Sequence, residues 1–455
     1  MKLRQSVPKI TGNGPHREYT SETTYRRIAP HLRRVGVTRV ANITGLDRVG
    51  IPVYNAISPR SFDIISVYNG KGATEIDAKT SAVMEAVERF AAGLPMRPVA
   101  VASYTELEAS GRRVLDPRSC NFEFHRAYTL DTPICWVEGF DLLNECAVLV
   151  PQFLAGYYLN FHEVPCYPVS TTNGIASGNS LEEAICHALC EVIERDDWTM
   201  ADLVSNRLAG FAAQEDGTPI GAAISAWAQD LHPSVDPDSL PERAQFFMDK
   251  FHAAEIDIEV KNITSATGIP SFQAVVSEFI SDSFSRSHHG IGTHPDAEVA
   301  VVRAIAEVAQ SRVVDIQAMR EDITAAGEPV EKALYHVRRS NRANPDAWAI
   351  KPSSRPVRLQ DVPTHPSSDV MDDVRTLLDR LRARGLDQAI VVDLSPPAVP
   401  ATVVRVIVPG AESWTVDRNK IGPRAREAWD GTLNTIRSAY AKRQQRTTGE
   451  QESNA

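Results

Sequence analysis

The chain has 455 residues, of which 58 are acidic and 48 basic, so its formal net charge is −10. Hydrophobic residues make up 43% and charged residues 23%, which is typical of a folded globular protein and excludes disordered and collagen-like chains. An acidic balance does not favour a protein that coats nucleic acid or an anionic membrane. We therefore expect a globular protein with neither kind of partner.

The predicted compartment is the cytoplasm. Residues 1–14 carry charge but no apolar stretch, so no secretory signal is predicted. The longest apolar run, 147–158, is too short to span a bilayer. The six cysteines form no CxxC pair and no zinc-binding spacing, which favours reduced thiols.

Taken in chain order, the sequence predicts a basic N-terminal arm, alternating strands and helices, and a polar end from residue 443. The predicted helices are 22–35 (interrupted by Pro30), 75–92, 180–203, 296–320 and 369–384. The predicted strands are 53–57, 63–67, 101–104, 135–139, 147–151, 388–393 and 402–408. Long connections are expected at 214–241 and 344–368. This alternation indicates an α/β (α+β) fold.

We divide the chain into three parts. Residues 1–65 form the arm and the start of a sheet, and residues 66–410 form the body that contains the three most periodic helices. Residues 411–455 form a basic C-terminal extension, whose end is expected to be disordered.

An internal repeat links the three periodic helices. Each has small residues followed by acidic or amide residues at the same spacing, and the first two share the pattern Glu-x-x-Glu-Arg. The repeated positions are Ala78, Ala82, Glu85 and Glu88; Ala184, Ala188, Glu191 and Glu194; and Ala300, Ala304, Glu307 and Gln310. A glycine-bearing segment, interpreted as a turn, precedes each helix, at 70–72, 177–179 and 290–292. The pattern predicts three related structural units.

The spacing places the polar residues of each helix on one face, because positions 4, 8 and 11 residues apart align on an α-helix. The two acidic faces hold Asp77, Ser81, Glu85 and Glu88, and Glu183, His187, Glu191 and Glu194. A solvated surface is the simpler interpretation of any one such helix. If the two faces converge, however, their carboxylates repel one another unless a cation lies among them.

Oxygen ligands without cysteine or paired histidines select Mg²⁺, which commonly bridges carboxylates and substrate phosphates. Glycine turns that open onto helix N-termini would offer amide N–H groups to those phosphates. Lys71, Arg195 and Arg312 would neutralise or clamp them. The segment at 70–72 lacks the GxxxxGK[ST] spacing of a Walker loop. The combination indicates a non-Walker site for a nucleotide with its metal.

At these residues the sequence resembles the YcaO family, enzymes that use ATP to activate peptide backbone amides. The matching stretches are 70–90, 170–196, 290–312 and 391–410, so the resemblance covers most of the chain. It implies a fold with repeated sheet–helix units that enclose a non-Walker ATP site, with 66–410 as the ATP-binding catalytic domain and with ATP and Mg²⁺ as cofactors.

The resemblance also assigns site residues by position. The implied metal ligands are Glu85, Glu88, Glu183, Glu191 and Glu194. The implied nucleotide-binding residues are Arg17, Thr24, Lys71, Ser177, Asn179, Glu183, Arg195, Gln310 and Arg312. The implied catalytic residues are Glu191, Glu194, Arg195 and Arg312. Either Ala176 or Ser177 would place a small side chain against the nucleotide.

In the implied reaction a nucleophile attacks a backbone carbonyl of a bound peptide, and ATP phosphorylates either the resulting oxyanion or the amide oxygen. That oxygen then leaves as phosphate. A neighbouring Cys, Ser or Thr side chain would give an azoline, sulfide a thioamide, and an amine an amidine. Residues 33–57 resemble the stand-alone subgroup associated with TfuA partners and thioamidation, and the sequence ends without the Pro-x-Pro-x-Pro tail of many azoline-forming members. We expect thioamide formation, with azoline or (macro)amidine formation as the alternative.

The expected partners are a precursor peptide or protein, a TfuA-like or other sulfur-delivery protein, and a second copy of the chain. Two other functions remain open at this point. One is a metal-dependent hydrolase that uses the glutamates around two ions. The other is a non-catalytic peptide-docking subunit with a degenerate nucleotide site.

Overall fold

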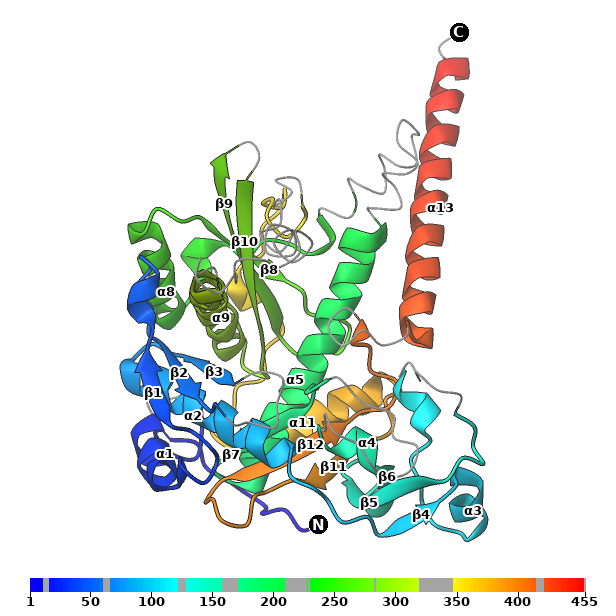
Figure 1. The fold of residues 1–455 in the computed structure, drawn as a ribbon. Helices are drawn as coiled ribbons and strands as arrows, with labels where there is room; N and C mark the ends of the chain where they lie inside the picture. The colour runs from blue at the N-terminus through cyan, green and yellow to red at the C-terminus, as the bar shows by residue number, and fades with distance from the viewer. Residues whose placement is uncertain are drawn as a thin grey trace, which may run out of the picture.

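The computed structural model describes residues 1–10, 16–59, 66–121, 128–157, 171–208, 227, 230–281, 284–318, 347–414 and 421–453. Over these residues the fold is a mixture of antiparallel sheets and helices, with α5 running through the middle and α2 and α9 to one side of it (Figure 1). This agrees with the predicted α/β (α+β) class.

The described strands form three sheets, and every pair of named strands is antiparallel. The first sheet has the order β1 (Arg39–Asn42), β2 (Val53–Ile57), β3 (Val67–Lys71). The second has the order β10 (Phe284–Thr293), β9 (Ser271–Ser281), β8 (Ile258–Asn262). The third has the order β4 (Ala100–Ala102), β5 (Ile134–Asp141), β11 (Ile390–Asp393), β12 (Thr402–Ile407), β7 (Ile175–Gly178), with β6 (Cys146–Pro151) paired to β5.

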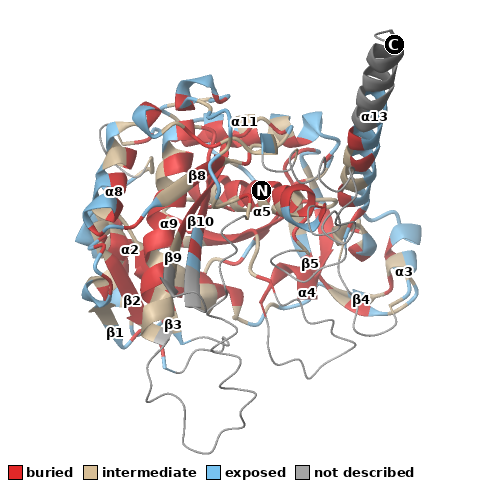
Figure 2. Cartoon of the chain, turned by 90° about the horizontal axis from the view of Figure 1, so that it is seen from above, coloured by how far each residue is buried: buried red, intermediate tan, exposed pale blue. Residues whose placement is uncertain are grey.

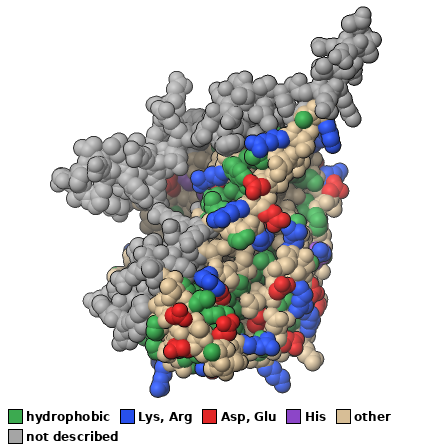
Figure 3. Space-filling view, turned by 90° about the vertical axis from the view of Figure 1, so that its right-hand side faces the viewer, with side chains coloured by type: hydrophobic (Ala, Val, Ile, Leu, Met, Phe, Trp, Pro, Cys, Tyr) green, Lys and Arg blue, Asp and Glu red, His purple; other side chains and the backbone are tan. Residues whose placement is uncertain are grey.

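The helices cover and separate these sheets. They are α1 (Ser21–Ile28), α2 (Glu75–Ala92), α3 (Tyr104–Ala109), α4 (Gln152–Ala155), α5 (Leu181–Asp202), α8 (Glu242–Ala253), α9 (Ala297–Ala318), α11 (Val370–Ala383) and α13 (Pro423–Ser453). Buried residues line long stretches of α5 and α9 (Figure 2), as expected of helices that pack on a sheet. On the face shown in Figure 3, Lys and Arg are interspersed with Asp and Glu, so the net negative charge is not concentrated there.

The three periodic helices lie where the sequence predicts them. Helix α2 agrees at both ends because Thr74 caps its first turn and Gly93 follows its last. Helix α1 ends at Ile28 and gives way to a 3₁₀ turn that contains Pro30. The predicted strand at 63–67 falls mostly outside the described residues. In the C-terminal extension the described residues include helix α13, Pro423–Ser453, and the predicted disorder of its end stays a prediction.

Each of the three central helices follows a strand whose glycine faces it. A Cβ on Gly70 in β3 would lie 2.1 Å from the amide nitrogen of Ala82 in α2, and one on Gly178 in β7 would lie 2.5 Å from that of Ala184 in α5. A Cβ on Gly290 in β10 would lie 2.3 Å from the carbonyl oxygen of Ala304 in α9. These glycines are therefore strand residues in contact with the helix backbone. The prediction of a turn is wrong for 290–292, which lies wholly in β10, whereas 70–72 and 177–179 each end one residue beyond a strand, in the connection to the helix. The repeat itself is a strand–helix unit packed through Gly and Ala.

Replacing Gly70 by Ala should destabilise the fold by about 3 kcal/mol, because the new methyl group overlaps the backbone of α2. Urea denaturation will measure the loss. Gly45→Ala is the matched control, since a Cβ there meets nothing within 4 Å. Equal stability of the two variants would show that the strand–helix contact is not as close as described.

The N-terminal arm is fixed to α11 and α5. The backbone amide of Val7 donates to Asp369, Lys9 forms an ion pair of 2.5 Å with Asp373, and Arg4 donates three hydrogen bonds to the Glu182 carboxylate, one of them from its backbone amide. These anchors hold the chain so that residues 16–24 reach the central helices.

Candidate nucleotide and metal site

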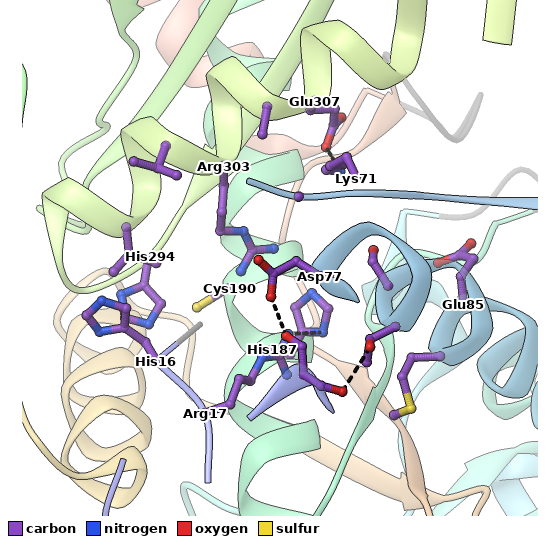
Figure 4. Close-up of a pocket in the computed structure, with 18 of the residues that line it drawn as sticks. His16, Arg17, Lys71, Asp77, Glu85, His187, Cys190, His294, Arg303 and Glu307 are labelled. Atoms are coloured by element: carbon purple, nitrogen blue, oxygen red, sulfur yellow. Dashed lines mark hydrogen bonds and ion pairs between the residues drawn. The ribbon is translucent and has the colours of Figure 1, made fainter. Parts of the chain in front are cut away.

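A cavity of about 940 Å³ lies between α2, α5 and α9 (Figure 4). Among the residues of each helix that line the cavity, four recur at the spacing i, i+4, i+8, i+11, and we number these four positions along each helix as tiers. From the first tier to the fourth they are Asp77, Ser81, Glu85 and Glu88; Glu183, His187, Glu191 and Glu194; and Val299, Arg303, Glu307 and Gln310. The sequence repeat therefore provides the three walls of the site. At the second position of the repeat, α9 carries Arg303, whereas α2 and α5 carry Ser81 and His187.

The helix starts explain why the three walls are in phase. The side chain of Thr74 accepts the amide of Asp77, and that of Ser180 accepts the amide of Glu183. In α9 the Asp296 carboxylate accepts the amide of Glu298. Such caps fix the first turn and with it the direction of every later side chain.

Burial raises the pKa of three acids in the third and fourth tiers, Glu88, Glu191 and Glu194. Burial raises the pKa of Glu88 well above its usual range, and the nearby charges of Glu85 and Glu191 raise it further. Burial likewise raises the pKa of Glu191 to about 7 and also raises that of Glu194. Among the described residues, the Oε2 atom of Glu194 is buried and accepts no hydrogen bond. The cluster therefore has more negative charge than its protein partners neutralise.

A divalent cation fits this cluster. The donors are carboxylate oxygens, one of which is buried and has no hydrogen-bond partner in the described part of the chain. Crowded carboxylates are stabilised when a hard cation binds among them. The residues that would hold Mg²⁺ are Glu85, Glu88, Glu191 and Glu194. Bound there, the ion would polarise phosphate oxygens and neutralise charge that develops on them.

Mg²⁺ should stabilise the protein more at pH 8 than at pH 5.5. Because the pKa of Glu191 rises from 4.5 to about 7 on folding, the native state binds more protons in this range, and the free energy of unfolding falls as pH rises through it. At the higher pH the acids are charged and bind the ion, which adds about 2.7 kcal/mol at a concentration 100 times its Kd. Thermal denaturation with and without Mg²⁺ isolates this difference, and an equal increase at both pH values would contradict the site.

The arm supplies a second group of predicted residues. Arg17 Nη1 donates to Glu183 Oε1 at 3.1 Å, and Thr24 Oγ1 donates to Asn179 Oδ1 at 3.1 Å. The Asn179 amide group donates to Glu183, whose other oxygen accepts the backbone amide of Glu18. All four predicted residues line the cavity. Glu183 differs from the other glutamates because hydrogen-bond donors surround its carboxylate.

The cations around the cavity pair with its acids. Lys71 Nζ lies 2.7 Å from Glu307, Arg89 Nε lies 3.0 Å from Glu85, and Arg195 lies 3.9 Å from Glu191. Arg303 extends from α9 into the cavity (Figure 4), where its charge acts on Glu194 and His187. Ser177 also lines the cavity, and its backbone amide donates to Glu88 at 3.0 Å.

Arg312 does not reach the cavity, so its predicted role at the phosphates requires correction. Arg312 is 2% exposed, and its guanidinium is held by Asp47 at 2.9 Å and 3.1 Å and by Glu278 at 2.5 Å. The reason is helical phase, since Arg312 is two residues beyond Gln310 and faces the opposite side of α9. Arg303, which the sequence assignment missed, lies four residues before Glu307 on the cavity face. The repeat spacing itself would have identified it.

Cys186, His294 and Asp373 form a second buried group, whose potential ligand atoms lie within 4.8 Å of one another. Lys9 already provides a cation to Asp373. The Asp296 amide donates to His294 Nδ1, which leaves the ring proton on Nε2, facing Asp373 at 3.5 Å. We therefore interpret this group as the anchor of the arm.

Comparison with known proteins identifies the family of the chain. The profile of the family described as YcaO cyclodehydratase, ATP- and Mg²⁺-binding, matches residues 69–412, and the chain belongs to this family. A protein of Methanothermobacter thermautotrophicus is 34% identical over 409 residues, which cover 89% of this chain and 97% of that protein. A Rhizobium leguminosarum protein, described as lying in the tfuA 3′ region, is 32% identical over 438 residues. The match covers 93% of this chain and 93% of that protein.

Two solved structures share the fold. YcaO from Methanopyrus kandleri, bound with AMPPCP and Mg²⁺, matches with a TM-score of 0.64 at 23% identity, over 91% of this chain and 98% of that one. A heterocyclase in complex with substrate and cofactor matches with a TM-score of 0.71 at 23% identity, over 90% of this chain but 54% of that longer one. ATP and Mg²⁺ are the cofactors of the family, as the sequence predicted. No helix among the described residues is long and apolar enough to cross a membrane.

Proposed function

We propose that the protein activates a backbone amide of a ribosomally made peptide or protein with ATP and Mg²⁺, and that sulfide then attacks to give a thioamide. The observation that supports ATP chemistry is the under-neutralised glutamate cluster on two walls of a cavity whose third wall carries Arg303. Family membership supports amide activation. The relative beside tfuA supports the thioamide product.

The residues divide into three roles. Glu85, Glu88, Glu191 and Glu194 hold Mg²⁺, and metal binding by Glu183 stays a prediction. Arg17, Thr24, Lys71, Ser177, Asn179, Arg195, Arg303 and Gln310 surround the nucleotide. Arg303 replaces Arg312 as the phosphate arginine because it lies in the cavity. These groups position the reactants and neutralise charge, which is the main contribution of a protein to phosphoryl transfer.

The reaction balances as a substitution at the amide carbon. The amide oxygen takes the γ-phosphoryl group of ATP, hydrosulfide forms the C–S bond, and the C–O bond breaks as phosphate leaves. The products are a thioamide, ADP and phosphate, without a change of redox state. A TfuA-like protein as the source of sulfide is part of the proposal.

Mass spectrometry of a candidate precursor peptide after incubation with the enzyme, ATP, Mg²⁺ and sulfide tests the proposal. Thioamidation increases the mass by the difference between sulfur and oxygen, whereas azoline or (macro)amidine formation from side chains of the peptide removes one water. Glu191→Gln is the inactive control. Loss of water would replace the thioamide assignment and leave amide activation intact. ATP turnover that does not depend on peptide, or peptide cleavage without ATP, would contradict both.

A further inference from the structure

His187 lies at the centre of the cavity wall, in the second tier, and is neither a metal ligand nor one of the nucleotide-binding residues proposed above (Figure 4). It follows Glu183 by one turn of α5 and precedes Glu191 by one turn. His187 therefore lies between Glu183, which contacts the N-terminal arm, and Glu191 and Glu194, which are proposed to hold the metal.

The contacts of the His187 ring define its protonation. The backbone carbonyl of Ser177 accepts a hydrogen bond from the ring, and Nδ1 lies 3.5 Å from Nη2 of Arg17. Burial, together with the positive charges of Arg17, Arg303 and Lys71, holds the pKa of the ring well below its usual value. The ring is therefore neutral, with the lone pair of Nδ1 directed to Arg17.

The two terminal nitrogens of Arg17 consequently have acceptors on successive turns of one helix. Glu183 accepts from Nη1 at 3.1 Å, and His187 faces Nη2. Two acceptors fix the plane of a guanidinium, whereas one allows it to rotate. A second carboxylate, at position 187, would also fix the plane, but it would repel an incoming phosphate. A neutral ring orients Arg17 without adding negative charge.

We propose that His187 is a positioning residue that orients Arg17 toward the phosphates of ATP. The inference rests on the nucleotide-binding role proposed above for Arg17. It also explains why a histidine interrupts a wall that is otherwise acidic.

A double-mutant cycle on binding of Mg²⁺·ATP, measured by isothermal titration calorimetry with a non-hydrolysable ATP analogue, tests the proposal without requiring a peptide. His187→Leu should weaken binding about fivefold in the wild-type background, which is the scale of one weak hydrogen bond to a charged group. In the Arg17→Ala background the same change should have almost no effect, because the group that it orients is absent. His187→Gln, which retains a neutral acceptor, should recover most of the binding. His252→Leu, at an exposed position of α8, is the surface control.

The outcomes separate the inference from the role of Arg17. Equal losses from His187→Leu with and without Arg17 would overturn the inference, since a purely structural role predicts additive effects. Unchanged binding in Arg17→Ala would instead refute the role of Arg17 itself. If His187→Leu does not fold, failure of the folded His187→Gln variant to bind better than Arg17→Ala would also overturn the inference.

Discussion

Replacing Glu191 by Gln is expected to lower peptide-dependent ATP turnover on the order of 10³-fold while the protein stays folded. Glu191 lies in the third tier, where its charge acts on Glu88 and where Glu194 and Glu85 in turn act on it. An amide of the same shape fills the space but provides no negative charge for the metal. Steady-state assays of phosphate release with saturating Mg²⁺ will measure the loss.

The same substitution should stabilise the protein in the absence of metal. At pH 8 the wild-type carboxylate is charged in a site that holds its pKa at about 7, so neutralising it should add on the order of 2 kcal/mol to the free energy of unfolding. The added stability from Mg²⁺ should be lost in parallel. Glu298→Gln, an exposed acid at the start of α9, is the control and should change neither quantity. A Glu191→Gln enzyme with full turnover would contradict the metal site.

Arg303→Ala is expected to lose affinity for ATP, whereas Arg312→Ala is expected to lose folding stability. Arg303 faces the cavity, and its removal should raise the KM for ATP at least tenfold, about 1.4 kcal/mol of binding, with little effect on stability. Arg312 is buried between Asp47 and Glu278, and its removal leaves these acids without their cation. Breaking such a buried pair costs about 3–5 kcal/mol of folding free energy.

ATP titrations and urea denaturation of both variants distinguish the two roles. Arg303→Lys retains the charge and should lie between Arg303→Ala and the wild type. A stable Arg312→Ala protein that fails to bind ATP would restore the original assignment of Arg312. A destabilised Arg303→Ala protein with normal KM would remove Arg303 from the site.

The central helices of the fold were predictable because their signals are local. Helix α2 has a capping Thr74 at its start and Gly93 after its end, and the structure agrees with both predicted bounds. The β9–β10 hairpin and α8 were missed. Strand β10 contains Gly290 and Gly292, which lie against the backbone of α9, and glycines of this kind resemble a turn in the sequence.

The site was predictable to the extent that helical phase defines it. The spacing placed Glu85, Glu88, Glu191 and Glu194 on cavity faces, and the structure places all four there. The contacts of Arg17 with Glu183 and His187 join residues about 170 positions apart, which no local pattern encodes. Arg312 was assigned by motif position alone, and its phase on α9 directs it to Asp47 instead.

Transfer of oxygen from the peptide to phosphate tests the central claim most directly. A precursor peptide whose reactive backbone carbonyl carries ¹⁸O is incubated with the enzyme, Mg²⁺, ATP and sulfide in unlabelled water, and the phosphate is analysed by mass spectrometry. Activation of the amide oxygen predicts one ¹⁸O in phosphate for each modified amide. Unlabelled phosphate, together with modified peptide, would show that ATP does not activate the amide and would contradict the proposed chemistry.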